Sequence, residues 1–253
     1  MAVKPVRPRR LVEWLSTVGG SLGRLAAGGV CAACQAPADE GVLCERCWAA
    51  LREITGRDYC RGCGHNAGPY ALVDDRCFRC RMGRPALARV VRVGPYQGVL
   101  QALVLGLKFA GKSHLDQMLG ALLAAAIQGD PQLTDVDALV PVPLHWRRRL
   151  RRGYNQAQLL AQAAANQLPH LHVEPFLIRT RDTVPQATLA TTDRLRNLKG
   201  AFAARPNAKI AGKHLCLVDD VTTTGTTLRI AARALRRAGA AKVSAVVIAV
   251  AAN

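Results

Sequence analysis

From residue 86 to the end of the chain, short apolar runs alternate with longer segments whose apolar residues recur at helical spacing. The runs of strand length are residues 88–93, 138–142 and 215–218, and the helical segments are 99–107, 114–127, an Ala/Leu-rich stretch ending near 168, and 226–237. Gly94-Pro95 is predicted to turn the chain, and Asp130-Pro131 to stop a helix. The alternation predicts an α/β domain with a mostly parallel sheet.

Upstream of this domain, eight of the nine cysteines form four Cys-x-x-Cys pairs. The pairs are Cys31/Cys34, Cys44/Cys47, Cys60/Cys63 and Cys77/Cys80. Each turn directs two thiolates to one tetrahedral ion, so two turns complete a closed structural zinc site. We expect one or two zinc ions, held by the sequential quartets; interleaved pairing stays open. A redox dithiol is the alternative. We favour a metal because a small segment with few core residues needs a bound ion to stabilise its fold.

The ninth cysteine, Cys216, falls in a predicted buried strand and is expected to be an inert core thiol. Together these patterns divide the chain into three segments. Residues 1–30 are basic and amphipathic, residues 31–85 form the small Cys-rich zinc module, and residues 86–253 form the α/β domain. The sequence Arg-Met-Gly-Arg-Pro at 81–85 marks the junction between the last two.

The N-terminal segment has some features of a signal peptide, because basic residues precede a short apolar stretch. Glu13 interrupts that stretch and two glycines end it, so we expect a short amphipathic helix instead. No apolar run approaches the ~20 residues that a membrane span needs. We therefore expect no membrane span and a cytoplasmic location, where thiols stay reduced and paired cysteines bind metal.

The chain is strongly basic: 35 Lys and Arg stand against 17 Asp and Glu, which gives a formal net charge of +18. Two zinc–thiolate sites would lower this charge to about +14. The excess favours an anionic partner such as nucleic acid or a polyphosphate. An arginine-rich proteome would produce the same excess without any binding role.

The densest chemistry follows the apolar run at 215–218, where Asp219 and Asp220 precede a loop of hydroxyls and glycine. That loop is Val221, Thr222, Thr223, Thr224, Gly225, Thr226 and Thr227. Open α/β sheets bind ligands at the carboxyl ends of their strands, and the loop's N–H groups and hydroxyls suit a phosphate. Carboxylates so close would repel that phosphate, so their partners are diol hydroxyls or a hydrated Mg²⁺. The alternative is a plain helix cap, which needs only one such residue.

A basic segment follows the strand at 138–142. It contains Arg147, Arg148, Arg149, Arg151 and Arg152, flanked by Trp146 and Tyr154. A solvated face is one interpretation. Because the segment leaves the same sheet edge as Asp219, we expect Arg149 and Arg152 to bind phosphate oxygens. Arg147, Arg148 and Arg151 with the two aromatic rings have the composition of a surface for single-stranded nucleic acid.

An apolar strand, two acids and a Thr/Gly loop resemble the phosphoribosyl pyrophosphate (PRPP) signature of the type I phosphoribosyltransferases. The resemblance implies their fold, with Asp219 and Asp220 as catalytic residues that hold the ribose 2′- and 3′-hydroxyls. It implies that residues 221–227 bind the 5′-phosphate and that Mg²⁺ accompanies PRPP. It also implies that the loop after the preceding strand contacts the pyrophosphate, through Val142, Pro143, Leu144 and His145.

One family is resembled in particular. The Cys-x-x-Cys module, Pro-Val-Pro at 141–143, Arg-Gly-Tyr-Asn-Gln-Ala at 152–157 and Asp-Asp-Val-Thr-Thr-Thr-Gly at 219–225 resemble the ComF/GntX proteins, which are linked to natural DNA uptake. The likeness spans the chain from Cys31 and includes Gln186, Arg194, Asn197 and Ala201-Phe202. Residues 179–199 are polar, basic and rich in Thr, which is typical of a mobile hood over a phosphate site. An ordinary surface loop is the alternative.

We therefore expect a PRPP-binding protein of the phosphoribosyltransferase family that acts in natural competence and transfers a phosphoribosyl group to an acceptor that the sequence does not identify. The alternative is a non-catalytic adaptor of the transformation machinery, which binds single-stranded DNA and uses the fold as a scaffold. The two intact acids favour the first hypothesis, and the arginine excess favours the second. The expected partners are PRPP, single-stranded DNA and proteins of the competence machinery.

Overall fold

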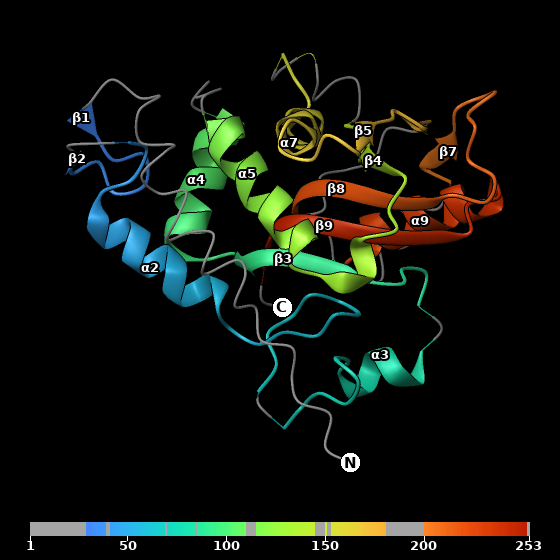
Figure 1. Cartoon of the computed structure of the whole chain (residues 1–253), viewed down its shortest axis with the longest axis horizontal. Helices are drawn as coiled ribbons and strands as arrows, with labels where there is room; N and C mark the ends of the chain where they lie inside the picture. Colours follow the sequence, from blue (N-terminus) through green and yellow to red (C-terminus); the bar gives the residue numbers. More distant parts are fainter. Residues whose placement is uncertain are drawn as a thin grey trace.

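The computed structural model describes residues 29–38, 41–68, 70–83, 85–109, 115–144, 150, 153–180 and 200–251. At its centre lies a five-stranded sheet with the strand order β3-β9-β8-β4-β5 (Figure 1). The strands are β3 (Val90–Pro95), β4 (Ala138–Pro141), β5 (His172–Val173), β8 (His214–Thr222) and β9 (Lys242–Val250). Every neighbouring pair is parallel, which confirms the predicted α/β class.

Helices cover both faces of this sheet. The helices α4 (Gly98–Phe109), α5 (Leu115–Gln128) and α7 (Gln156–Ala165) lie on one face, and α9 (Thr226–Arg237) lies on the other beside a hairpin of β6 (Leu177–Arg179) and β7 (Phe202–Ala204) (Figure 1). A short 3₁₀ helix, η2 (Pro131–Leu133), follows α5. The predicted helix at 226–237 is confirmed at both ends, and those at 99–107 and 114–127 are confirmed to within two residues.

The central strands are buried on both faces, as the continuous apolar run at 215–218 predicts. Side chains alternate along β8, so Cys216 and Val218 join the core under α4, α5 and α7, while Leu215 and Leu217 join the core under α9. The helices of the first core pack closely. A Cβ on Gly120 of α5 would lie 2.3 Å from the Cβ of Ala163 in α7, so only glycine permits this contact.

The predicted turn at Gly94-Pro95 is wrong. Both residues belong to β3 and pair with Ala249 and Val250 of β9. The strand β3 is at the edge of the sheet, where a proline removes no ladder hydrogen bond if its ring faces away from the neighbouring strand.

The Cys-rich segment contributes β1 (Gly29–Val30), β2 (Pro37–Ala38), α2 (Glu45–Thr55) and α3 (Phe78–Met82). Its first half is not separated from the α/β core: Cys31, Leu51 and Ile54 belong to the same buried cluster as Val93 and Leu100. Apolar packing therefore crosses the predicted boundary near residue 85. The division into a Cys-rich module and an α/β domain stays a prediction from the sequence. Within the described parts of the chain, no helix has the length and apolar character needed to cross a membrane.

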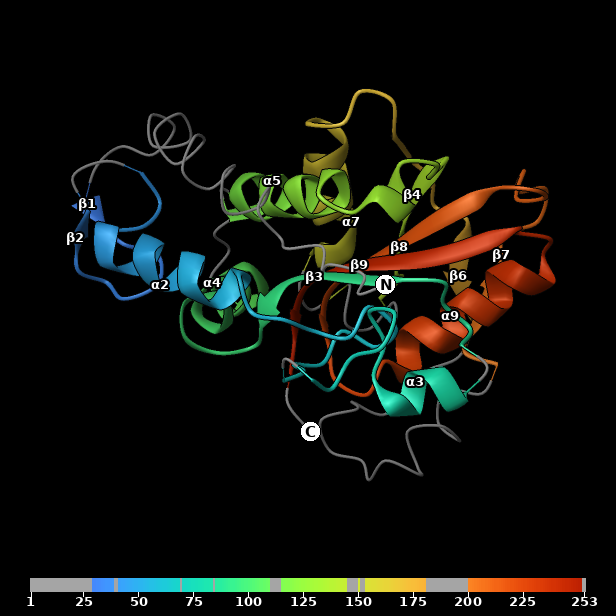
Figure 2. The same ribbon diagram turned by 60° about the horizontal axis from the view of Figure 1, so that its bottom comes forward.

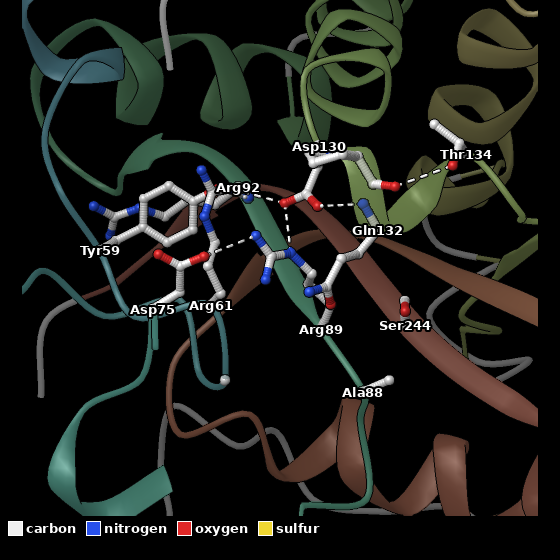
Figure 3. Close-up of polar contacts among 12 residues, drawn as sticks. Tyr59, Arg61, Asp75, Ala88, Arg89, Arg92, Asp130, Gln132, Thr134 and Ser244 are labelled. Atoms are coloured by element: carbon white, nitrogen blue, oxygen red, sulfur yellow. Dashed lines mark hydrogen bonds and ion pairs between the residues drawn. The ribbon is translucent and has the colours of Figure 1, made fainter. Parts of the chain in front are cut away.

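The second half of the segment docks on the sheet through a buried ionic network centred on Asp130 (Figure 3). The Asp130 side chain is 1% exposed; one carboxylate oxygen accepts from Arg89 Nε at 2.6 Å and lies 3.3 Å from Arg61 Nη1. The other oxygen accepts from Gln132 N at 3.1 Å and so caps η2. Arg89 also lies 3.3 Å from Asp75 Oδ2, so the Cys-rich loops, β3 and the end of α5 are joined by one set of charges.

Next to this network, the ring of Tyr59 is contacted by two guanidinium groups. Arg61 and Arg92 lie 4.2 Å and 4.6 Å from the ring centroid (Figure 3). Arg92 is buried, and burial lowers the pKa of its guanidinium to about 10. A hydrogen bond to Asn66 and the face of the Tyr59 ring surround this buried cation.

The network predicts a large cost for removing Asp130. Asp130→Ala should lower the free energy of unfolding by about 3–5 kcal/mol, because it leaves the buried Arg89 without its main carboxylate. Urea denaturation measures the change. The control is Glu53→Ala, which removes the exposed i,i+4 pair with Arg57 at 2.8 Å and should cost no more than about 0.5 kcal/mol. Equal effects of the two substitutions would contradict a structural role for the network.

Candidate functional site

The two predicted acids lie in β8, at a point where the sheet is open on one side. Pairing with β9 continues to Thr222, but pairing with β4 ends at Val218, where Val142 N donates to the Val218 carbonyl at 3.0 Å. Asp219 and Asp220 therefore follow the last contact with β4, beside the loop that leaves β4. This is the carboxyl edge of a parallel sheet, where α/β proteins bind ligands.

Main-chain donors and one lysine fix the two carboxylates. Asp220 N donates to Asp219 Oδ1 at 2.9 Å, and Val221 N donates to Asp220 Oδ1 at 2.6 Å. The remaining oxygen of Asp220 forms an ion pair of 2.9 Å with Lys108 Nζ, from the last turn of α4. Both side chains are largely buried, with 19% and 12% of their surface exposed. The pair therefore lies in a less polar medium than a surface salt bridge.

The protonation of Asp219 differs from that of an ordinary carboxyl. Although the residue is partly exposed, desolvation of its carboxylate, followed by the charge of Asp220, raises the pKa of Asp219 to about 8. The Asp220 N–H and Lys108 act in the opposite direction. At neutral pH the unliganded protein therefore holds a proton on Asp219.

The hydroxyl-rich loop follows at once and leads into α9. Gly225 occupies the cap position with φ +70, a left-handed conformation that favours glycine. Since Gly225 has no side chain, no threonine caps α9 from that position, which counts against the interpretation of the loop as a simple cap. Instead, Thr224 Oγ1 and Thr226 Oγ1 lie 2.7 Å apart, and Arg229 Nη2 donates to Thr226 Oγ1 at 3.2 Å.

The segment Tyr154-Asn155 connects the parts of the site. The Tyr154 hydroxyl donates to the carbonyl of Leu107, one residue before Lys108. Asn155 Nδ2 donates to the Val142 carbonyl at 3.1 Å, while its Oδ1 accepts from Ala157 N and caps α7. Two adjacent side chains thus fasten the end of α4 and the loop after β4 beside the acidic pair.

Several predicted site residues can be placed. Val142 is buried, and Pro143 and Leu144 are half-buried at the start of the loop after β4. Tyr154 is half-buried, and its hydroxyl donates to the Leu107 carbonyl in α4, which is a structural role. Its role in nucleic-acid binding stays a prediction. Ala201 and Phe202 are core residues. The following predicted residues lie outside the described residues: His145, Trp146, Arg147, Arg148, Arg149, Arg151, Arg152, Gln186, Arg194 and Asn197.

Lys108 is not among the site residues that the sequence predicts. Its local signal is weak, because a lysine in the last turn of an apolar helix commonly interacts with the helix dipole. Its partner is distant in sequence, so only the packing of α4 against the sheet reveals the ion pair.

The eight paired cysteines form two clusters suited to zinc. One consists of Cys31, Cys34, Cys44 and Cys47, and the other of Cys60, Cys63, Cys77 and Cys80; within each, all sulfur atoms lie within 4.8 Å of one another. This arrangement favours the sequential quartets over interleaved pairing. Cys216 is separate and buried, and burial raises the pKa of its thiol to about 12.

Each cluster contains a cysteine whose pKa is well below the ordinary value. In the second cluster, a hydrogen bond from Cys63, with those from Cys77 N and Gly62 N at 3.2 and 3.3 Å, lowers the pKa of Cys60 to about 4. In the first cluster, the N–H of Ala36 is the main group that lowers the pKa of Cys34 to about 6. Thiolates are the form that binds metal, so the donor set fits a structural ion.

The fold and the acidic edge define a phosphoribosyltransferase-fold protein, and a family model described as "Phosphoribosyl transferase domain" matches residues 150–253. The chain is 36% identical over 220 residues to "DNA utilization protein YhgH" of Escherichia coli K12, covering 85% of this chain and 94% of the relative. It is 34% identical to "Competence protein F" of Haemophilus influenzae, covering 78% and 85%, and 30% identical to "Competence protein ComFC" of Bacillus subtilis, covering 79% and 80%. The chain therefore belongs to the ComF/GntX family.

The raised pKa of Asp219 predicts a pH-dependent stability. With a folded pKa of about 8 and an unfolded value near 4, the stability contributed by the protonated carboxyl is full below about pH 4 and is lost as the pH rises through 8. Asp219→Asn removes this loss and retains an acceptor for Asp220 N. The unliganded variant should therefore gain stability over the parent, increasingly from pH 5 to 9, by on the order of a few kcal/mol.

Urea midpoints of the parent and the variant, measured without ligand across this pH range, test the expectation. Asp58→Asn, at an exposed carboxyl, is the matched control and should show no such trend. A difference between Asp219→Asn and the parent that stays constant with pH would show that Asp219 titrates normally.

Proposed function

We propose that the chain binds PRPP at the carboxyl end of β8, with Asp219 and Asp220 accepting hydrogen bonds from the ribose hydroxyls and residues 222–227 holding the 5′-phosphate. One observation carries the proposal: two carboxylates lie beyond the end of β4 and are followed directly by a helix start whose cap position is Gly225. Carboxylates suit a diol, and the N–H groups of a helix start suit a phosphate. A sugar phosphate presents both groups in this order.

The reaction we propose is transfer of the phosphoribosyl group. The bond between ribose C1 and the pyrophosphate oxygen breaks, a bond from C1 to the acceptor forms, and negative charge grows on the departing pyrophosphate. We assign the loop from Val142 to His145 to receive that group, since Asn155 Nδ2 holds its first carbonyl, and Arg149 and Arg152 are the expected cations. Mg²⁺ bound with PRPP would neutralise pyrophosphate charge, and the oxygens of the acidic pair are donors of the kind it prefers.

Lys108 has a clear part in this site. In the unliganded protein its ammonium group lies 2.9 Å from Asp220 Oδ2, where its positive charge offsets the repulsion between the two adjacent carboxyl groups. When the ribose hydroxyls reach the acids, Lys108 remains a buried positive charge beside a highly anionic ligand. We therefore assign it the role of holding Asp220 in place through the ion pair and of attracting PRPP.

We also propose that each cysteine quartet holds a structural Zn²⁺. Four sulfur donors complete the tetrahedral preference of the ion, so a metal in such a site stabilises loops and has no open position for catalysis. Reduced thiols of this kind are maintained in the cytoplasm, which is where we infer that the protein acts.

The second candidate is a non-catalytic adaptor that binds single-stranded DNA. The relatives named for competence and DNA utilization favour it, as does the formal net charge of +18. In this function the sheet is a scaffold, and affinity for DNA comes from basic surfaces. The two candidates are compatible in one chain, but each has its own test.

The PRPP proposal predicts losses at separate parts of the site. Asp220→Asn should weaken binding by roughly ten- to a hundredfold, because it removes a charge-assisted hydrogen bond of ~1.5–3 kcal/mol. Lys108→Met should also weaken it, because it removes the positive charge that pairs with Asp220 beside the anionic ligand. Gly225→Val should weaken PRPP binding more than either of these substitutions. A Cβ at this position meets no other atom, but a φ of +70 is strained for any β-branched residue.

Isothermal titration of PRPP with Mg²⁺ measures these affinities, and Asp58→Asn serves as the control. A screen of nucleobases and amines for pyrophosphate release then separates binding from transfer. If all three folded site variants bind PRPP as tightly as the parent does, the proposal is wrong and the loop serves only as the start of α9.

The zinc proposal predicts two equivalents of metal and sequential pairing. Cys34→Ser with Cys44→Ser changes only the first cluster, so metal content should fall from two equivalents to one. Cys34→Ser with Cys60→Ser changes both clusters, so it should fall to zero. Elemental analysis of protein purified without added zinc gives these values, with Cys216→Ser as the control. The opposite outcome for the two double variants would establish interleaved pairing.

A further inference from the structure

The outer face of α9 is a continuous row of arginines. Arg229, Arg233, Arg236 and Arg237 are all exposed, whereas Leu228, Ala231 and Leu235 are buried against the sheet. The helix contains no Asp or Glu. A solvated helix face usually mixes charges of both signs, so a row of one sign indicates an anionic partner.

These arginines are not neutralised within the described parts of the chain, where none of the four forms an ion pair with a carboxylate. Arg229 donates to Thr226 Oγ1, and Arg236 donates to the Ala240 carbonyl at 3.0 Å. From residue 200 to 242 the sequence has eight Lys and Arg but only two acids, Asp219 and Asp220. Both acids belong to the site at the end of β8, so this stretch of sequence has no other acid that could neutralise the arginines of α9.

A second unusual surface lies on the Cys-rich segment around α3. Three large side chains there are exposed to solvent: Tyr70 at 97%, Phe78 at 71% and Met82 at 74%. Arg79 and Arg81 lie between Phe78 and Met82 on α3. Several exposed apolar side chains within thirteen residues mark an interaction surface, since isolated domains rarely leave such groups uncovered.

The two surfaces lie on the same face of the sheet. A Cβ on Gly64, in the second cysteine loop, would meet Val90 and Val250, and both valines belong to the core that α9 covers through Leu228 and Leu235. The second cysteine loop therefore covers β3 and β9 on the face that α9 also covers. Figure 2 shows α3 and α9 on this side of the sheet.

We propose that the outer face of α9 and the exposed side chains around α3 form a binding surface for a single strand of nucleic acid. Arg229, Arg233 and Arg237 recur every four residues, or about 6 Å along the helix, which is close to the spacing of phosphates in an extended strand. Guanidinium groups bind phosphate oxygens in pairs, and exposed rings such as Tyr70 and Phe78 stack on unpaired bases. The inference deepens the second candidate function by giving it a site distinct from Arg147–Arg152.

Other anionic partners fit this surface less well. An amphipathic helix binds a lipid surface through its apolar face, but the apolar face of α9 is buried in the domain. A duplex would present its phosphates to the arginines but would leave Tyr70 and Phe78 without bases to stack on. An unpaired strand uses both kinds of side chain.

The test measures the affinity of the full-length protein for a fluorescent oligothymidylate at several salt concentrations. Arg233→Ala with Arg237→Ala should reduce the slope of log K against log salt by about 1.4, since each phosphate contact contributes about 0.7 for a single strand. Phe78→Ala should weaken binding by about tenfold and leave the slope unchanged, because stacking releases no counterions. Arg57→Ala and Leu105→Ala are the matched controls and should change neither quantity. Arg57 is an exposed residue just after α2, and Leu105 is an exposed residue of α4.

The outcomes separate this site from the function on which it rests. If the parent binds no oligonucleotide, both the site and the second candidate function fail, while PRPP binding is tested independently. If the parent binds but the folded α9 and Phe78 variants match it, the adaptor function stands and this site is wrong. Anionic phospholipid vesicles that bind as tightly, and lose binding in the same variants, would overturn the assignment to nucleic acid.

Discussion

The site depends on placing two neighbouring carboxylates inside a sheet. Charges of one sign at adjacent positions repel, and burial strengthens that repulsion, so the arrangement persists only with local compensation. The structure supplies three forms of it: main-chain N–H donors to each acid, the ammonium group of Lys108, and a proton retained on Asp219. The acidic pair is thus held in a form that a ligand with hydroxyl donors can complete.

This compensation explains why segments far apart in sequence are tied together here. Lys108 comes from α4, and the hydroxyl of Tyr154 holds the neighbouring carbonyl of Leu107. Asn155 holds the loop after β4 through the Val142 carbonyl. The residues Tyr-Asn, which in the sequence look like part of a basic recognition segment, therefore position the cation and the loop on which the site depends.

The sequence predicts what is encoded locally. The helix at 226–237, the burial of residues 215–218 and the cysteine quartets all follow from spacing within short windows. The ion pairs Lys108–Asp220 and Arg89–Asp130 join elements that are distant in sequence. The residues next to each partner do not indicate with which residue it pairs. The prediction of a turn at Gly94-Pro95 is wrong because turns and edge strands accept the same residues, and only the strand order distinguishes them.

The basic excess is also divided in a way that composition does not reveal. Arg61, Arg89 and Arg92 are used internally, where they join the second cysteine loop to the sheet through Asp130, Asn66 and Tyr59. The arginines of α9 remain on the surface, and that helix begins at the threonine loop and continues away from it. Its first turn adds the positive end of the helix dipole to the same side of the molecule. One helix therefore supplies both the N-terminus of the proposed phosphate site and the arginines of the proposed nucleic-acid surface.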